Sequence, residues 1–121
     1  MELMTKDIAA RLHQADQLLI ASNMERSPQE IIVKYFAPWG AATWWITTAT
    51  PLDEINGEPC DPAQAKDWHM FGFVTLGLGP DCDELGYTLL SELQKLSGPF
   101  GLKVERDLHY AGHQLAEVMQ T

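Results

Sequence analysis

The sequence has few cysteines, no long apolar run and no export signal. Two cysteines, Cys60 and Cys82, in a chain of 121 residues are too few for the disulfide framework of a secreted domain, so we expect both to be reduced. The longest uncharged stretch, residues 35–52, contains Pro38 and Gly40 and is not expected to form a membrane helix of about 20 residues. The N-terminal residues carry charges throughout and lack the apolar segment of a signal peptide. These absences predict a cytoplasmic protein without a membrane partner.

The sequence also lacks the motifs of familiar chemistry. No Cys-x-x-Cys pair is present, and residues 77–81 ("GLGPD") lack the lysine and the helix start that a phosphate-binding loop needs. His109 and His113 lie four residues apart, but Gly112 and a strand ending near Tyr110 argue against the helix that would bring them to one metal ion. We therefore predict no cofactor and no metal.

Basic residues are scarce, with 8 lysines and arginines against 17 acidic residues and a net charge of −9. The imbalance is concentrated between Asp53 and Glu92, where nine carboxylates accompany one base, Lys66. Such a region repels a phosphate backbone, so we expect no direct nucleic-acid binding. It suits a cation or a basic protein partner, although a solvated face that keeps the protein soluble is the simpler interpretation.

Hydrophobic periodicity predicts one α+β domain over residues 1–121. Apolar residues recur at helical spacing from Ile8 to Leu19, and Thr5 is placed to cap a helix over 5–20. Runs of β-branched and aromatic residues predict three strands, over 30–36, 43–50 and 67–77. Pro38 and Gly40 between the first two runs indicate a hairpin.

The later part of the chain is predicted to alternate loops, short helices and one more strand. The predicted segments are an acidic loop over 78–86, a helix over 89–96 capped by Thr88, a strand over 102–110 and a helix over 113–120. The strand over 67–77 is apolar on both faces, which is typical of a central strand covered on both sides. We predict a mainly antiparallel sheet of about four strands with helices packed on it.

Four blocks of the sequence resemble a known family. They are "VKYFAPWGAATWWIT", "FGFVTLG", "ELGYTLLSEL" and "GLKVERDLHY", and they are similar to the short bacterial proteins of the domain-of-unknown-function family numbered 2958. The likeness covers nearly the whole chain and departs from the family in the longer insert "NGEPCDPAQAKD" and in "HYAGHQL". The family has no established activity. The resemblance implies a bacterial cytoplasmic accessory protein of a plasmid, an integrative element or a phage.

Carboxylates on the predicted last strand form the candidate catalytic set. Glu105 and Asp107 lie two residues apart and therefore share one face of a strand, where they would hold a divalent cation or act as an acid–base pair. Glu84 would supply a third ligand in a metal-dependent hydrolase or nuclease. No Asp/Glu-x-Lys pattern follows these acids, so an ion-paired strand face is the simpler interpretation and an enzyme is the alternative.

Tryptophans supply part of the candidate binding set. Adjacent Trp44 and Trp45 point to opposite faces of their strand, so one belongs to the core and the other is covered by a helix or exposed. Trp39, in the hairpin turn, is expected to be the most exposed ring, and exposed tryptophans are common at interfaces. A purely structural role in the core is the simpler interpretation for the group.

Charged residues complete the binding set. Arg106 is expected to lie with its stem along apolar surface and its guanidinium paired to Glu84 or Glu92. The candidate binding residues are Trp39, Trp44, Asp81, Asp83, Glu84 and Arg106. We expect a non-enzymatic protein that binds a basic partner, such as a nucleic-acid-acting factor of the host, and a self-associating structural subunit is a further alternative.

Overall fold

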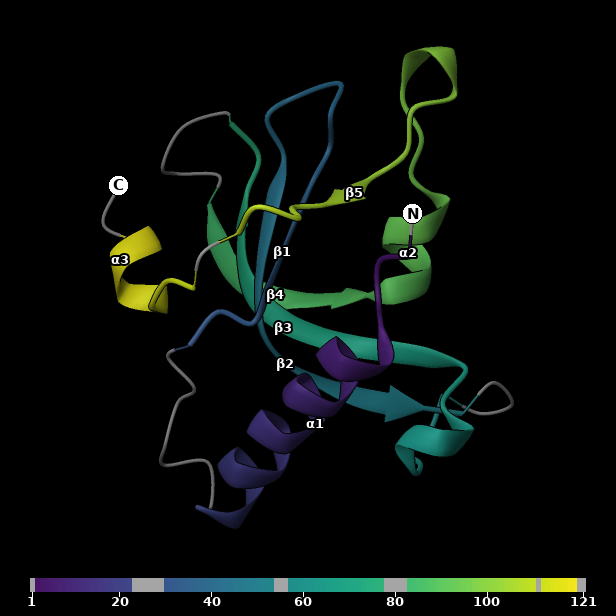
Figure 1. The fold of residues 1–121 in the computed structure, drawn as a ribbon, viewed down its shortest axis with the longest axis vertical. Helices are drawn as coiled ribbons and strands as arrows, with labels where there is room; N and C mark the ends of the chain where they lie inside the picture. Colours follow the sequence, from purple (N-terminus) through teal and green to yellow (C-terminus); the bar gives the residue numbers. More distant parts are fainter. Residues whose placement is uncertain (1, 23–29, 54–56, 78–82, 111, 120–121) are drawn as a thin grey trace.

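A computed structural model describes the chain over residues 2–22, 30–53, 57–77, 83–110 and 112–119. Over these ranges an antiparallel sheet of five strands, in the order β4-β3-β2-β1-β5, carries three α-helices (Figure 1). The helices are α1 (Lys6–Ala21), α2 (Leu90–Lys95) and α3 (Leu115–Met119). The strands are β1 (Val33–Phe36), β2 (Thr43–Leu52), β3 (Asp67–Thr75), β4 (Glu84–Leu89) and β5 (Glu105–Arg106). The predicted α+β class is confirmed, with one strand more than the four expected.

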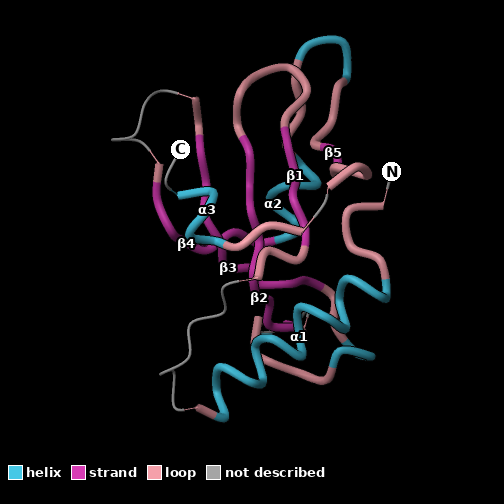
Figure 2. Tube along the Cα trace, turned by 60° about the vertical axis from the view of Figure 1, so that its left-hand side comes forward, coloured by secondary structure: helices cyan, strands magenta, loops and turns pink. Residues whose placement is uncertain are grey.

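Helix α1 begins where its sequence predicts. The hydroxyl of Thr5 accepts a hydrogen bond from the Ile8 amide at 3.2 Å, which caps the first turn. The buried side chains of α1 are Ile8, Leu12 and Asp16, each four residues after the last. Helix α1 packs against β2 (Figure 2). This spacing therefore brings a carboxylate toward the sheet together with two apolar residues.

Strand β2 is the centre of the sheet and contains a β-bulge. It pairs with β1 as the predicted hairpin, and with β3 on its other side, where the register shifts between Ile46 and Thr48. Gly72 of β3 lies opposite Ile46, and a Cβ there would come 1.9 Å from the Trp45 carbonyl oxygen, so the close approach requires glycine. Beyond the bulge, Thr48 lies opposite Phe71 and Thr50 opposite His69, so the four side chains share one side of the sheet.

Residues 84–89 form a strand, whereas the sequence predicted a loop followed by the start of a helix. Strand β4 pairs antiparallel with β3 along its whole length. Its glutamate and glycine give it weak strand propensity, so the pairing with β3 decides its structure. Helix α2 therefore begins at Leu90, and the Glu92 carboxylate caps it by accepting the Leu89 amide at 3.1 Å, in place of the predicted Thr88 cap.

The predicted last strand over 102–110 is shorter in the structure. Only Glu105–Arg106 pair with β1, as strand β5. Asp107 still donates its amide to the Lys34 carbonyl at 3.0 Å, but its carboxylate accepts the His109 amide at 2.9 Å. This local bond turns the chain away from the sheet edge and ends the strand.

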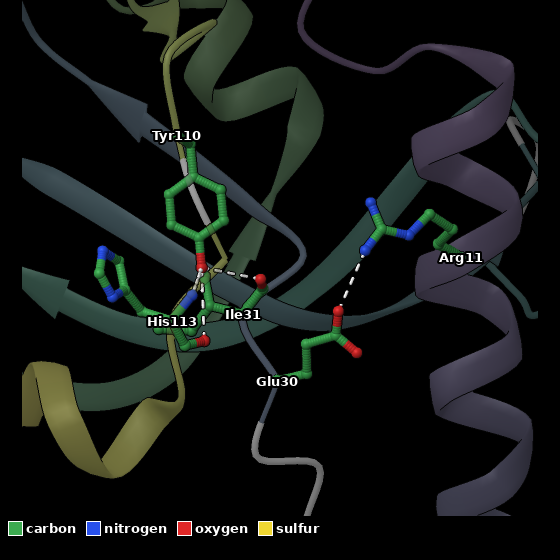
Figure 3. A network of polar contacts seen from close by, with 5 residues as sticks. All are labelled: Arg11, Glu30, Ile31, Tyr110 and His113. Atoms are coloured by element: carbon green, nitrogen blue, oxygen red, sulfur yellow. Dashed lines mark hydrogen bonds and ion pairs between the residues drawn. The ribbon is translucent and has the colours of Figure 1, made fainter.

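Tyr110 is one of the residues that attach the C-terminal segment (Figure 3). The Tyr110 hydroxyl donates to the Ile31 carbonyl at 2.8 Å and accepts the His113 amide at 2.7 Å. The Ile31 amide in turn donates to the His113 carbonyl at 3.0 Å, and an exposed Arg11–Glu30 ion pair lies nearby. Helix α3 follows this junction and is shorter than the predicted helix over 113–120.

The core lies on both faces of the sheet. The larger cluster lies on the face that carries α1 and α2, and among its fully buried side chains are Leu12, Tyr35, Ile46, Met70 and Leu93. A smaller cluster of Ile31, Phe73 and Leu115 lies on the other face, against α3. Strand β3 thus has a strand on each side and core on each face, as the sequence predicted.

Candidate functional site

The sheet separates the three carboxylates of the candidate catalytic set. Strands β4 and β5 are its two edges, and the register places Glu84 and Arg106 on one row that crosses three strands between them. Four strand spacings correspond to about 19 Å, whereas one divalent ion needs oxygen ligands at about 2.0–2.6 Å. Glu84 therefore cannot share an ion with Glu105 and Asp107. In the described ranges, no three histidine, cysteine or acidic residues gather as a metal site.

The strand that carries Arg106 pairs with β1 at the edge of the sheet. Asp107 forms the ion pair expected for this strand face, with its Oδ2 3.5 Å from Lys34 Nζ. In place of the predicted pairing with Glu84, Arg106 lies opposite Tyr35, whose hydroxyl donates to the Leu3 carbonyl at 2.7 Å. Burial raises the pKa of Tyr35 well above its usual range, against the opposing effect of the Arg106 charge, so the phenol is neutral.

The two candidate tryptophans are packed rather than presented to solvent. Trp44 belongs to the larger core cluster, and Trp45 lies half-buried on the other face with its ring beneath Lys34 Nζ, 4.5 Å from the centroid. Trp39 is also half-buried, because its ring lies against Gly98, where a Cβ would come 2.3 Å from a ring carbon. Trp39 is therefore less exposed than the sequence predicts.

The acidic residues of the 53–92 region divide into two groups. Asp81 lies outside the described residues, and Asp83 and Glu84 lie where β4 begins. Asp53, Asp61 and their neighbours precede β3, whose 9 residues span about 30 Å. The acidic region is thus two separate surfaces at opposite ends of β3.

A groove lies toward the start of β3, where Thr50 of β2, His69 of β3 and Tyr87 of β4 line it. A cavity of about 560 Å³ there is bordered by the C-terminal half of α1, the sheet and the segment before β3. A second hollow of about 600 Å³ shares Thr50, Pro59, His69 and Tyr87 with it. We call the two hollows together the groove.

Aromatic side chains form the floor of the groove. The His69 ring stacks on Tyr87 with centroids 4.4 Å apart and an interplanar angle of 16°. Phe71 also lies against Tyr87, with ring centroids 5.0 Å apart and an interplanar angle of 53°. Tyr87 belongs to the edge strand β4 and is 63% exposed. The groove therefore presents a fixed aromatic surface to solvent.

Helix α1 adds a buried carboxylate to the wall. Asp16 is 9% exposed, and the Thr50 hydroxyl donates to its Oδ2 at 3.2 Å. Burial raises the pKa of Asp16 above its usual value, while the Thr50 hydrogen bond and the nearby His13 oppose this shift. His13 lines the same cavity, and its buried Nδ1 has no hydrogen-bond partner among the described residues. The groove thus contains polar groups whose interactions are incomplete.

The rim of the groove is acidic. Pro59 and Cys60 line the groove and lie between Glu58 and Asp61 in the sequence, and Glu92 also lines it. Partial burial and the nearby Asp53 and Asp61 carboxylates raise the pKa of the Cys60 thiol. Cys60 is a free thiol, whereas Cys82 lies outside the described residues. A thiol that keeps its proton is a poor nucleophile, so the raised pKa disfavours covalent chemistry at Cys60.

A larger hollow elsewhere has no preferred charge. It measures about 680 Å³ and lies between the N-terminal segment, α2 and residues 101–105. Its charged lining residues are two glutamates, Glu2 and Glu105, and two lysines, Lys66 and Lys103. These charges balance, so this hollow offers less selectivity than the groove.

Sequence reasoning did not select the main residues of the groove. Asp16 gave a usable signal, because it lies four residues after Leu12 on the apolar stripe of a predicted helix. The sequence carries no signal that places Tyr87 on a strand, because it predicts a loop over 78–86 and a helix over 89–96. His69 lies within the strand predicted over 67–77, and it is half-buried in the structure.

The fold and the groove define a class: an α+β protein with an acid-rimmed aromatic groove on an antiparallel sheet. The chain belongs to the family described as Protein of unknown function (DUF2958), whose model matches residues 3–120. No curated protein and no solved structure matches the chain. Within the described ranges, none of the helices has the length and apolar character needed to cross a bilayer.

Proposed function

We propose that this chain is a non-enzymatic binding protein whose groove receives a basic segment of a partner protein. One observation carries the proposal: the exposed Tyr87 ring stands at the centre of a groove with carboxylates in its wall and on its rim. An arginine or lysine side chain contains both an apolar stem and a cation. The groove offers apolar and aromatic surface to the stem and negative charge to the cation.

The expected energies favour arginine. A cation over an aromatic face contributes about 0.5–2 kcal/mol, more as water is excluded. A guanidinium also stacks on planar rings and forms bidentate bonds to carboxylates, which an ammonium does not. Asp16 favours a cation of either kind, since its ionised form is destabilised by burial and a neighbouring positive charge would offset that cost.

The setting of this function is also a proposal. The family resemblance supports a cytoplasmic accessory protein of a bacterial mobile element. The net charge of −9 supports a basic partner, and nucleic-acid-acting host proteins are commonly basic. An enzyme is less well supported, because the carboxylates proposed for it lie on opposite edges of the sheet.

The test is calorimetric titration with a short peptide that contains two arginines, and with the same peptide carrying citrullines, which keep the shape and lose the charge. We expect the arginine peptide alone to bind. Tyr87→Ala is expected to weaken binding about tenfold or more, and Tyr87→Phe to preserve most of it. Equal binding of the two peptides, or unchanged binding to Tyr87→Ala, would contradict the proposal.

Charge-matched variants locate the binding surface. Asp61→Asn removes a carboxylate from the rim of the groove, whereas Glu84→Gln removes one from the other acidic surface. Both residues are exposed, so neither change should disturb the fold. We expect only Asp61→Asn to weaken binding of the peptide. If only Glu84→Gln weakens binding, the peptide binds the acidic surface at the other end of β3, and the proposal is wrong.

A further inference from the structure

Residues 96–102, which we call the finger, project between α2 and β5. An isolated bridge pairs Ser97 with Lys103 at the base of the finger. The Gly98 amide donates to the Leu102 carbonyl at 2.8 Å, and the Leu102 amide donates to the Pro99 carbonyl at 3.2 Å. The Trp39 ring supports the finger from the side at Gly98. These contacts hold the finger in a defined shape.

The tip of the finger exposes an aromatic ring on an unfavourable backbone. Phe100 is fully exposed, and its φ of 59° lies in the left-handed region that a residue with a Cβ rarely adopts. Leu96 and Leu102 are also exposed on the same loop. A strained, exposed phenylalanine gives the isolated chain no stability, which points to a contact outside the chain.

Two lysines flank the finger in an otherwise acidic protein. They are Lys95 and Lys103, and no carboxylate occurs between them. The finger therefore places an aromatic ring between two positive charges in the sequence. The groove has the complementary properties, an aromatic floor around Tyr87 and an acidic rim.

The finger does not line the groove of its own chain, since none of residues 96–102 borders either hollow. The finger lies toward one end of the long axis of the molecule and the C-terminal half of α1, a wall of the groove, toward the other (Figures 1 and 2). The complementary surface must come from another molecule. A second copy of this chain offers that surface on residues already described.

We infer that the finger of one copy docks into the groove of a second copy, with Phe100 on the Tyr87–Phe71 surface and Lys95 and Lys103 toward the acidic rim. The inference rests on the proposed function, because it names a basic segment that the groove receives. The two contacting surfaces differ, so the association is head-to-tail and each added copy leaves one finger and one groove available.

The test is sedimentation velocity over a range of concentrations with variants that disable one surface each. Phe100→Asn removes the ring and keeps a residue that tolerates the left-handed backbone. Tyr87→Ala removes the centre of the groove. We expect the wild type to associate as concentration rises, and each variant to associate at least about tenfold more weakly.

A mixture of the two variants is the decisive arm. Phe100→Asn retains its groove and Tyr87→Ala retains its finger, so the mixture is expected to form a one-to-one dimer that neither variant forms alone. A wild type that stays monomeric, or a Phe100→Asn variant that associates like the wild type, would overturn the inference. If the wild type is monomeric while the arginine peptide still binds the groove, the self-association fails and the proposed function stands.

Discussion

At the scale of single residues, Asp16 has the most informative environment. It occupies a position on α1 that the helical repeat reserves for apolar side chains, and it is buried against β2 with Thr50 as its hydrogen-bond donor. A buried carboxylate costs stability unless a charge partner compensates for it. Its position on the apolar stripe is the one expected if Asp16 forms an ion pair with a cation that enters the groove.

The Asp16→Asn variant tests this environment through pH. Burial raises the pKa of Asp16 in the folded state, so stability is lost as pH rises from the usual carboxyl range through the folded pKa. An asparagine still accepts from Thr50 and does not ionise. We expect Asp16→Asn to melt a few degrees higher than the wild type at pH 7 and at the same temperature below the unfolded pKa.

Thermal melts followed by circular dichroism across this pH range measure the difference. The exposed variant Glu84→Gln is the control and should follow the wild type. A lower melting temperature for Asp16→Asn at pH 7, or a gap that widens on acidification, would show that burial of the charge is not what limits stability.

A substitution at Gly98 tests whether the Trp39 ring packs against the finger. A Cβ at Gly98 would come 2.3 Å from the Trp39 ring, so Gly98→Ala must displace that ring. We expect a loss of about 1–3 kcal/mol in urea unfolding and a change in tryptophan fluorescence. Gly86→Ala is the matched control, because its Cβ would meet no atom within 4 Å. Equal effects of the two changes would refute the contact.

At the scale of elements, the sequence predicts the parts whose signals are local. The cap at Thr5 and the apolar repeat define α1, and the β-branched and aromatic runs define β1, β2 and β3. Strand β4 has no such signal, since "ELGYTL" acquires its structure by pairing with β3. The groove depends on this pairing and on the bulge at Ile46 and Thr48, and neither is encoded within one short segment.

The C-terminal element provides a prediction at this scale. Tyr110 joins the segment before β1 to the segment before α3 through its hydroxyl, which bonds Ile31 and His113. Tyr110→Phe keeps the ring and leaves these groups without that partner. We expect a loss of about 1–2 kcal/mol and faster exchange of the His113 amide hydrogen.

Hydrogen exchange followed by NMR separates this effect from a general loss of stability. Amides within α1 are the internal reference, because α1 packs on β2 and does not depend on Tyr110. If the His113 amide exchanges no faster relative to α1 in Tyr110→Phe, the hydroxyl does not hold the C-terminal segment.

At the scale of the whole molecule, the arrangement of charge matters more than its sum. The excess of acid in residues 53–92 was predicted as one region, but β3 divides it into two surfaces. Some of these acids are structural, as Asp67 accepts both the amide and the hydroxyl of Ser91 at 3.0 and 2.6 Å. The carboxylates left on the rim of the groove, beside its aromatic floor, carry the proposed function.

The measurement that tests this account most directly is a map of backbone amide chemical shifts during titration with the arginine peptide. We predict that the shifts concentrate on residues 13–17, 48–50, 69–71 and 85–89, decline as salt is added and are absent with the citrulline peptide. Shifts centred instead on residues 105–107, or equal shifts with both peptides, would contradict a groove that binds a basic segment.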